Sequence, residues 1–145
     1  MARQNEYGQP IGDPLAGDFP RPRPPHKSMV GRYCTLEPVS TQHAEALFDA
    51  FSGATDSRNW TYLPMEPFES VAECQAWLSA AMQSEDPQYF TVLDANGTAV
   101  GWASYLRIDP DAGAIEVGWI NFSPRMQRSA ISTEAMYLRM ARVFD

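Results

Sequence analysis

The residues best suited to chemistry lie in one stretch of the sequence, VGWINFSPRMQRSAIST, at positions 117–133. An apolar run ends at Pro124, and Arg125 and Arg128 then lead into a row of small residues. If a helix begins here, its first amides have no partners within the helix and lie at the positive end of its dipole. Small residues let this backbone approach an anion, and arginines add charge-assisted hydrogen bonds. The stretch predicts a phosphate site; the alternative is an ordinary helix start capped by Ser132 or Thr133.

A single carboxylate, Glu116, stands in the apolar run before this loop. Burial raises a carboxyl pKa toward the range that suits a general base. The alternative is that Glu116 faces solvent or pairs with an arginine. The two cysteines, Cys34 and Cys74, lie in apolar segments without metal-ligand spacing or a neighbouring histidine, so we predict buried thiols, no covalent nucleophile and no metal site.

The elements that must position this loop can be predicted from the residues around it. A strand is expected over 32–39, and Ser40 and Gly53 are expected to bound a helix with apolar residues at helical spacing. Ser70 and Glu73 form a capping box for a second helix. The aromatic loop between these two helices contains Trp60 and Tyr62.

Three antiparallel strands are predicted next, over 88–94, 99–109 and 114–122, with a tight turn at Asn96-Gly97. The third strand is apolar on both faces, with Ile115, Val117 and Trp119 predicted on one of them, so helices should cover both faces of the sheet. A last amphipathic helix is predicted from Thr133, with Met136, Met140, Val143 and Phe144 on one stripe.

Composition sets the class of protein. With 145 residues and 44% hydrophobic content, the chain can form one domain with its own core. No run approaches the ~20 apolar residues of a membrane span and the N-terminus does not resemble a secretory signal, so we predict a cytoplasmic protein. A formal charge of -7 argues against nucleic acid and anionic membranes as partners. Residues 1–28 are rich in proline and predict an extended arm.

The order of elements, the ANG turn, EVGWINFSP and QRSAISTEA together resemble the GCN5-related N-acetyltransferase (GNAT) superfamily, in the branch of the ribosomal-protein N-terminal acetyltransferases. The resemblance covers residues 29–145. It implies an α/β (α+β) fold with a mixed, mainly antiparallel sheet flanked by helices on both faces. It also implies that the family fold is truncated after its third helix, with the general acid expected beyond residue 145. The open strand edge would then be completed by another chain or in a homo-oligomer.

The resemblance further implies acetyl-CoA as cosubstrate and a loop whose amides hold its pyrophosphate. Ala130 and Ser132 stand where the family pattern has glycine or a small residue, which would cost about 1 kcal/mol wherever φ must be positive. The pantetheine arm would pair with the backbone of the preceding strand. The implied cofactor-binding residues are Ile120, Asn121, Phe122, Arg125, Gln127, Arg128, Ser129, Ala130, Ile131, Ser132 and Thr133.

The implied reaction is direct attack of a primary amine, from a small molecule or a protein N-terminus, on the thioester. Glu116 would be the base, and Trp60, Tyr62 and Trp102, with Tyr105, would contact the acceptor. The alternative function is a non-catalytic or degenerate module that binds acyl-CoA or another protein and needs a second chain to complete its fold.

Overall fold

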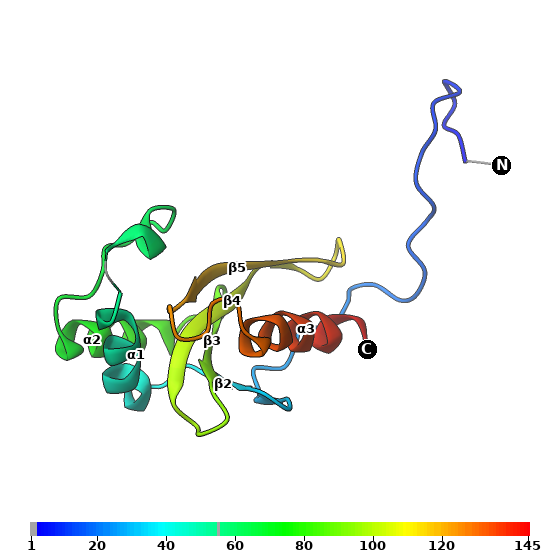
Figure 1. Ribbon diagram of the computed structural model, residues 1–145. Coiled ribbons are helices and arrows are strands. Elements are labelled where there is room, and N and C mark those ends of the chain that lie inside the picture. Colours follow the sequence, from blue (N-terminus) through cyan, green and yellow to red (C-terminus); the bar gives the residue numbers. More distant parts are fainter. Residues whose placement is uncertain (1–2, 55) are drawn as a thin grey trace.

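The computed structural model describes residues 3–54 and 56–145, which form a five-stranded antiparallel sheet and three α-helices (Figure 1). The strands lie in sequence order across the sheet: β1 Met29–Val30, β2 Thr35–Pro38, β3 Gln88–Leu93, β4 Ala99–Asp109 and β5 Ala114–Phe122. The helices are α1 Ala44–Ser52, α2 Val71–Ala81 and α3 Ala130–Phe144, with 3-10 turns η1 Thr41–His43 and η2 Arg58–Trp60.

The helices cover opposite faces of the sheet, as the apolar third strand predicted. Leu47 of α1 and Leu78 of α2 share a buried cluster with Trp102 of β4, whereas Ala135 of α3 packs in a second cluster with Phe90 of β3. Figure 1 shows α1 and α2 together at one end of the sheet and α3 beside its other half. The predicted α/β class is confirmed; every strand pair of the described sheet is antiparallel.

Local sequence signals explain where the first two helices begin. The Ser40 hydroxyl accepts a hydrogen bond from Gln42 N at 3.3 Å and caps η1, which continues directly into α1. Gly53 is the C-cap of α1. The Ser70 hydroxyl accepts from Glu73 N at 3.2 Å. The Glu73 carboxylate accepts from Glu69 N at 2.7 Å, one residue before the backbone amide that a capping box uses.

A β-bulge interrupts the pairing of β4 with β5. Ser104 pairs with Gly118 and Trp102 pairs with Asn121, so two residues of β5 lie opposite one residue of β4. Trp119 takes up the extra length with φ of 48°, an uncommon backbone conformation for a bulky residue. It packs toward Tyr89 on the α1–α2 side. The prediction that Trp119 shares a face with Ile115 and Val117 is wrong, because the bulge breaks the period of two.

The last helix begins three residues before the predicted Thr133, and it buries a different face. Ala135 and Arg139 are its buried residues, and the Arg139 guanidinium lies 4.6 Å over the Tyr105 ring. Burial lowers the pKa of Arg139 to about 10. Met140 and Phe144 are 50% and 85% exposed. The predicted stripe through these two residues is therefore not the face of α3 that packs on the sheet.

The proline-rich arm has two parts. Residues 3–18 extend away from the domain, and the following residues run along it (Figure 1). Arg21 N donates to Pro110 O at 2.8 Å, and Gln88 Nε2 donates to Pro24 O at 3.1 Å. The Arg142 guanidinium of α3 donates to carbonyls of Pro25, Lys27 and Ser28. The second half of the arm is therefore part of the folded body.

Candidate functional site

The loop between β5 and α3 is a tight turn around Ser123. The Ser123 carbonyl accepts from Met126 N at 3.0 Å and from Gln127 N at 3.2 Å. The Met126 side chain is fully buried in the α3-side core and anchors the turn. Arg128 follows with φ of 55°, which turns the chain into α3. The loop is thus fixed by its own backbone before the helix begins.

The first amides of α3 are free of protein acceptors. Thr133 N donates to Ser129 O at 3.5 Å, and in the described chain no acceptor is present for the amides from Arg128 to Ser132. A 15-residue helix adds the positive end of its dipole at the same place. Five consecutive unpaired donors at a helix start form the arrangement that phosphate groups use.

The small residues of the loop lie at the start of α3, but their places in the helix differ in part from those predicted. Ser129 occupies the N-cap position, but its hydroxyl donates to Met126 O at 2.6 Å. The Ser132 hydroxyl donates to Ser129 O at 2.9 Å. The capping alternative with Ser132 or Thr133 is therefore wrong. Ala130 and Ser132 lie within α3, and positive φ falls instead on Arg128, so the expected cost at the two glycine positions does not arise.

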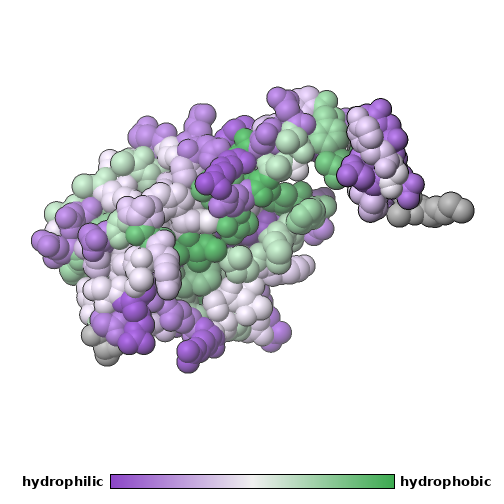
Figure 2. All heavy atoms as spheres, turned by 90° about the horizontal axis from the view of Figure 1, so that it is seen from above, coloured by the Kyte–Doolittle hydropathy of each residue, from purple (hydrophilic) through white to green (hydrophobic). Residues whose placement is uncertain are grey.

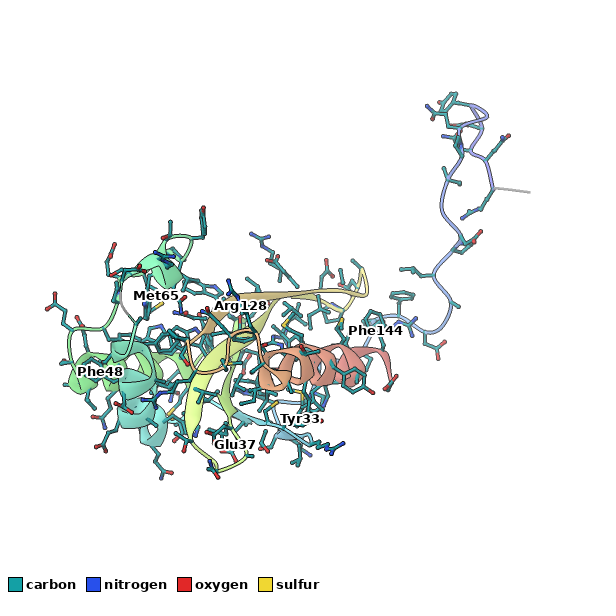
Figure 3. All side chains as sticks on the ribbon, in the orientation of Figure 1. Tyr33, Glu37, Phe48, Met65, Arg128 and Phe144 are labelled. Carbon is teal, nitrogen blue, oxygen red and sulfur yellow. The ribbon has the colours of Figure 1, made fainter. Side chains whose placement is uncertain are left out.

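The polar side chains of the loop are divided between the protein and solvent. Arg125 Nη2 lies 2.7 Å from Asp49 Oδ2 of α1. Gln127 Nε2 donates to Asn59 Oδ1 at 2.8 Å and to Phe122 O at 2.7 Å. Arg128 is exposed just before the start of α3, at the end of this helix opposite to Phe144 (Figure 3). Arg128 has no acidic partner among the described side chains. Arg128 is the loop arginine left for a ligand.

The outer edge of β5 differs from the predicted pantetheine site. Ser123 N donates to Val100 O, and Phe122 pairs with Gly101, so the backbone groups of Phe122 face away from β4. By alternation, those of Asn121 face β4. The Phe122 carbonyl accepts from Asn59 Nδ2 at 2.9 Å and from Gln127. Of the three positions predicted to pair with the pantetheine arm, Asn121 has its backbone groups directed toward β4, and the carbonyl of Phe122 already accepts two hydrogen bonds. Ile120, at the bulge, is 36% exposed.

A buried row of polar atoms crosses the sheet beside this edge, and it was not predicted from the sequence. Thr91, Trp102 and Asn121 are cross-strand neighbours on β3, β4 and β5. Each is at most 2% exposed, and Thr91 Oγ1, Trp102 Nε1 and Asn121 Nδ2 have no hydrogen-bond partner within the described residues. Hydrogen-bonding capacity is thus left unused at the end of β5.

Glu116 lies in the first half of β5 in a solvated setting. Its carboxylate is 2.8 Å from Arg107 Nη1, and its side chain is 43% exposed. The expected desolvation of this carboxylate is absent, and the alternative of an arginine partner is what the structure shows. The proton-accepting role of Glu116 stays a prediction.

Of the residues predicted to contact the acceptor, three are buried in the core and one lies on the surface. Trp60, Trp102 and Tyr105 are 6%, 0% and 0% exposed. Trp60 and Trp102 belong to the aromatic cluster under α1 and α2, with ring centroids 5.7 Å apart. These residues pack the core, and their assignment as direct contacts is corrected. Tyr62 is 97% exposed in the loop that follows η2 and is free to meet a ligand.

One carboxylate at the start of α3 has a structural role that the sequence did not reveal. Glu134 accepts from the backbone amides of Arg32, Tyr33 and Cys34 at 2.8, 2.6 and 2.8 Å. Desolvation would raise the pKa of Glu134, but these hydrogen bonds outweigh it and lower the pKa below the usual value. Glu134 thereby joins α3 to the turn between β1 and β2.

Both cysteines are buried, as predicted. Burial first, and then the Glu134 carboxylate, raise the pKa of Cys34 to about 12, and burial raises the pKa of Cys74 to about 11. Thiols with such pKa values remain protonated at neutral pH and are poor nucleophiles.

Across residues 3–54 and 56–145, no cluster of three metal-ligating side chains is present. In the same ranges, no helix has the length and apolar character needed to cross a membrane.

Comparison with known proteins identifies the family. The profile of the acetyltransferase (GNAT) domain matches residues 34–145. A GCN5-related N-acetyltransferase from Brucella melitensis is 41% identical, with a TM-score of 0.83 over 90% of this chain and 60% of that one. A probable GNAT-family acetyltransferase from Chromobacterium violaceum ATCC 12472 is 31% identical, with a TM-score of 0.79 over 94% of this chain and 69% of that one. The chain belongs to the GNAT acetyltransferase family.

More distant structures share the fold alone. A spermidine N-acetyltransferase from Vibrio cholerae, in complex with CoA and spermine, is 17% identical, with a TM-score of 0.58 over 77% of this chain and 63% of that one. Among proteins with curated functional descriptions, none matched this sequence. The chain spans about 60% of the length of the Brucella melitensis acetyltransferase.

Proposed function

We propose that this chain is an acetyl-CoA-dependent N-acetyltransferase that moves the acetyl group from CoA to a primary amine. The observation that carries the proposal is the run of five amides, Arg128 to Ser132, without protein acceptors at the start of α3. They would hold the diphosphate of acetyl-CoA, with Arg128 adding charge. The CoA complex of the spermidine N-acetyltransferase with the same fold supports this choice of ligand.

In the proposed reaction a neutral amine attacks the thioester carbonyl directly. The new C–N bond forms as the C–S bond breaks, the CoA sulfur leaves with the electron pair, and the amine loses one proton. Glu116 would accept that proton directly or through water. Arg107 Nη1 contacts its Oε2, and its Oε1 has no hydrogen-bond partner among the described residues. The two protonated thiols of the chain support direct transfer without a covalent intermediate.

We propose the class of acceptor from the net charge of the chain, and its contact residue from the exposure of Tyr62. A formal charge of -7 favours a basic acceptor, either a small amine or a protein N-terminus as in the ribosomal-protein branch. The exposed Tyr62 is the proposed contact on the acceptor side. A cytoplasmic location fits these substrates and remains a proposal from the sequence.

Two measurements test this function. Calorimetry should show saturable binding of acetyl-CoA to the 145-residue chain, and a thiol reagent should detect CoA release when an amine panel is added. Absence of acetyl-CoA binding would refute the proposal. Binding without CoA release for any amine would favour the second candidate, a non-catalytic acyl-CoA-binding module.

The second candidate, with its need for another chain, rests on exposed apolar surface. Tyr137, Met140 and Phe144 of α3 are 61%, 50% and 85% exposed, and the outer side of β5 has no neighbouring strand in the described sheet. Figure 2 shows apolar side chains also gathered across the middle of the face seen from above. Surfaces of this kind favour association with further polypeptide, in a homo-oligomer or with a second chain.

A further inference from the structure

Asn59 meets the candidate cofactor loop although it lies far from it in the sequence. Asn59 belongs to η2, in the segment between α1 and α2, and Gln127 follows 68 residues later. Their side-chain amides bond to each other at 2.8 Å, and both donate to the Phe122 carbonyl, at 2.9 and 2.7 Å. We call Asn59, Gln127 and the Phe122 carbonyl the amide clamp. The three groups form a closed ring of hydrogen bonds.

The clamp acts on the last residue of β5, where the strand passes into the loop. The Phe122 carbonyl faces the outer edge, because Ser123 N already donates to Val100 on the β4 side. A carbonyl oxygen has two lone pairs, and the clamp supplies one donor for each. The carbonyl is therefore saturated and has no capacity left for a pantetheine N–H.

The clamp also fixes the residue directly before the free amides. Gln127 N donates to Ser123 O, and the Gln127 side chain is held by Asn59, so both the backbone and the side chain of this residue are restrained. Arg128, with its positive φ, and the free amides follow at once. The second tether of the loop, Arg125 to Asp49, joins side chains that are 45% and 68% exposed. The clamp is itself exposed at Gln127, and it differs from this ion pair in restraining the residue directly before Arg128.

We propose that Asn59 is a positioning residue for the cofactor loop: it holds the Phe122 carbonyl and the Gln127 side chain so that the amides from Arg128 to Ser132 keep one orientation. Asn59 acts through the loop and not by touching the acetyl group. Because it belongs to the α1–α2 segment, it also links the proposed acceptor side to the proposed CoA side. The inference rests on the function proposed above.

The test compares CoA affinity with the stability of the unliganded protein. Asn59→Leu keeps the branched shape of the side chain, with somewhat more volume, and removes both hydrogen bonds. The dissociation constant for CoA, measured by calorimetry, should rise about tenfold, which corresponds to ~1.4 kcal/mol. Arg58→Ala is the matched control, because Arg58 is the preceding residue of the same turn and, among the described residues, its side chain bonds only to Asp56. It should bind CoA as the unmodified chain does.

Separate outcomes decide the inference and the function. If the unmodified chain fails to bind CoA, the proposed function is refuted and the role of Asn59 is refuted with it. If the unmodified chain binds and Asn59→Leu binds equally well, only the role of Asn59 is overturned. A lower melting temperature with unchanged CoA affinity also overturns it, since that result shows a purely structural contact. Asn59→Ala removes the amide without bulk and keeps the test valid if leucine cannot be accommodated.

Discussion

At the scale of single residues, the ion pair between Glu116 and Arg107 decides how the proposed base should be tested. Glu116→Gln removes the only proton acceptor proposed on β5 while keeping its shape. If Glu116 is the base, kcat should fall by about 10²–10⁴ and KM for acetyl-CoA should stay constant, measured by CoA release. Arg107→Gln is the control, because it opens the ion pair and leaves the carboxylate in place. Full turnover of Glu116→Gln would exclude this role.

Glu134 predicts a dependence of stability on pH. Its pKa is lowered in the folded state, so its carboxylate stabilises the fold above the unfolded pKa near 4.5, and this contribution is lost as the pH falls through the folded value. Glu134→Gln should lower stability by about 1–2 kcal/mol at pH 7, because backbone amides lose a charged acceptor. Thermal melts should show this difference shrinking below pH ~4.5.

A matched carboxylate separates this effect from general charge. Glu66 is exposed in the loop between α1 and α2, and Glu66→Gln should leave the melting temperature unchanged at every pH. If Glu134→Gln melts as Glu66→Gln does, the bonds from Arg32, Tyr33 and Cys34 contribute nothing to stability. The three donors were not predictable from sequence because they lie about a hundred residues away, in the turn after β1.

At the scale of elements, the start of α3 allows binding to be tested apart from folding. Ala130 is the first helical residue, and Ser129 before it is extended, with φ of -125° and ψ of 169°. Proline suits both features, since it fits the first helical position and favours an extended residue before it. Ala130→Pro removes one free amide. It should leave the melting temperature unchanged or higher and weaken acetyl-CoA binding about 10–100-fold, as loss of a bond to a charged group implies.

The control at this position is Ala130→Gly, which keeps the amide. Glycine should lower the stability of the protein by at most the ~1 kcal/mol that it costs in a helix interior, and it should leave acetyl-CoA affinity nearly unchanged. Ala130→Pro should therefore change mainly the affinity, and Ala130→Gly mainly the melting temperature. If Ala130→Pro binds acetyl-CoA as tightly as the unmodified chain, the amide of Ala130 does not hold the diphosphate.

The sequence was sufficient to predict most elements, because their signals are local. Ser40, Ser70 and the turn at Asn96-Gly97 each act within a few residues, and the elements they bound are present. The bulge at Trp119 was missed because nothing in the composition of β5 distinguishes a bulged tryptophan from a regular one. The face of α3 was missed because a buried arginine, Arg139, over Tyr105 replaces an expected apolar side chain.

The location of the candidate site stays a prediction, and its contacts could not be predicted from the sequence. The small residues after Pro124 indicate an anion site without knowledge of the fold, and the amides there are free of protein acceptors in the described chain. Which side chains remain available depends on partners distant in sequence, such as Asp49 for Arg125 and Asn59 for Gln127. Such pairings leave no mark in the local pattern.

At the scale of the whole molecule, the exposed apolar residues of α3 predict association. Met140 and Phe144 lie one helical turn apart and are both exposed. Light scattering should show a mass above 16.2 kDa that increases with concentration, and Met140→Glu with Phe144→Glu should shift it toward the monomer. Glu66→Gln again serves as a control remote from α3. A monomer at all concentrations, or no effect of the two glutamates, would contradict association through α3.

The single extra residue of the bulge sets the phase of everything that follows it in β5. If β5 instead paired regularly with β4 from Gly118 onward, Phe122 would lie opposite Val100 and not opposite Gly101. Its carbonyl would then face β4, out of reach of Asn59. The bulge, with no change of charge or hydrophobicity, thus determines the direction in which the last residue of β5 presents its carbonyl to the candidate cofactor loop.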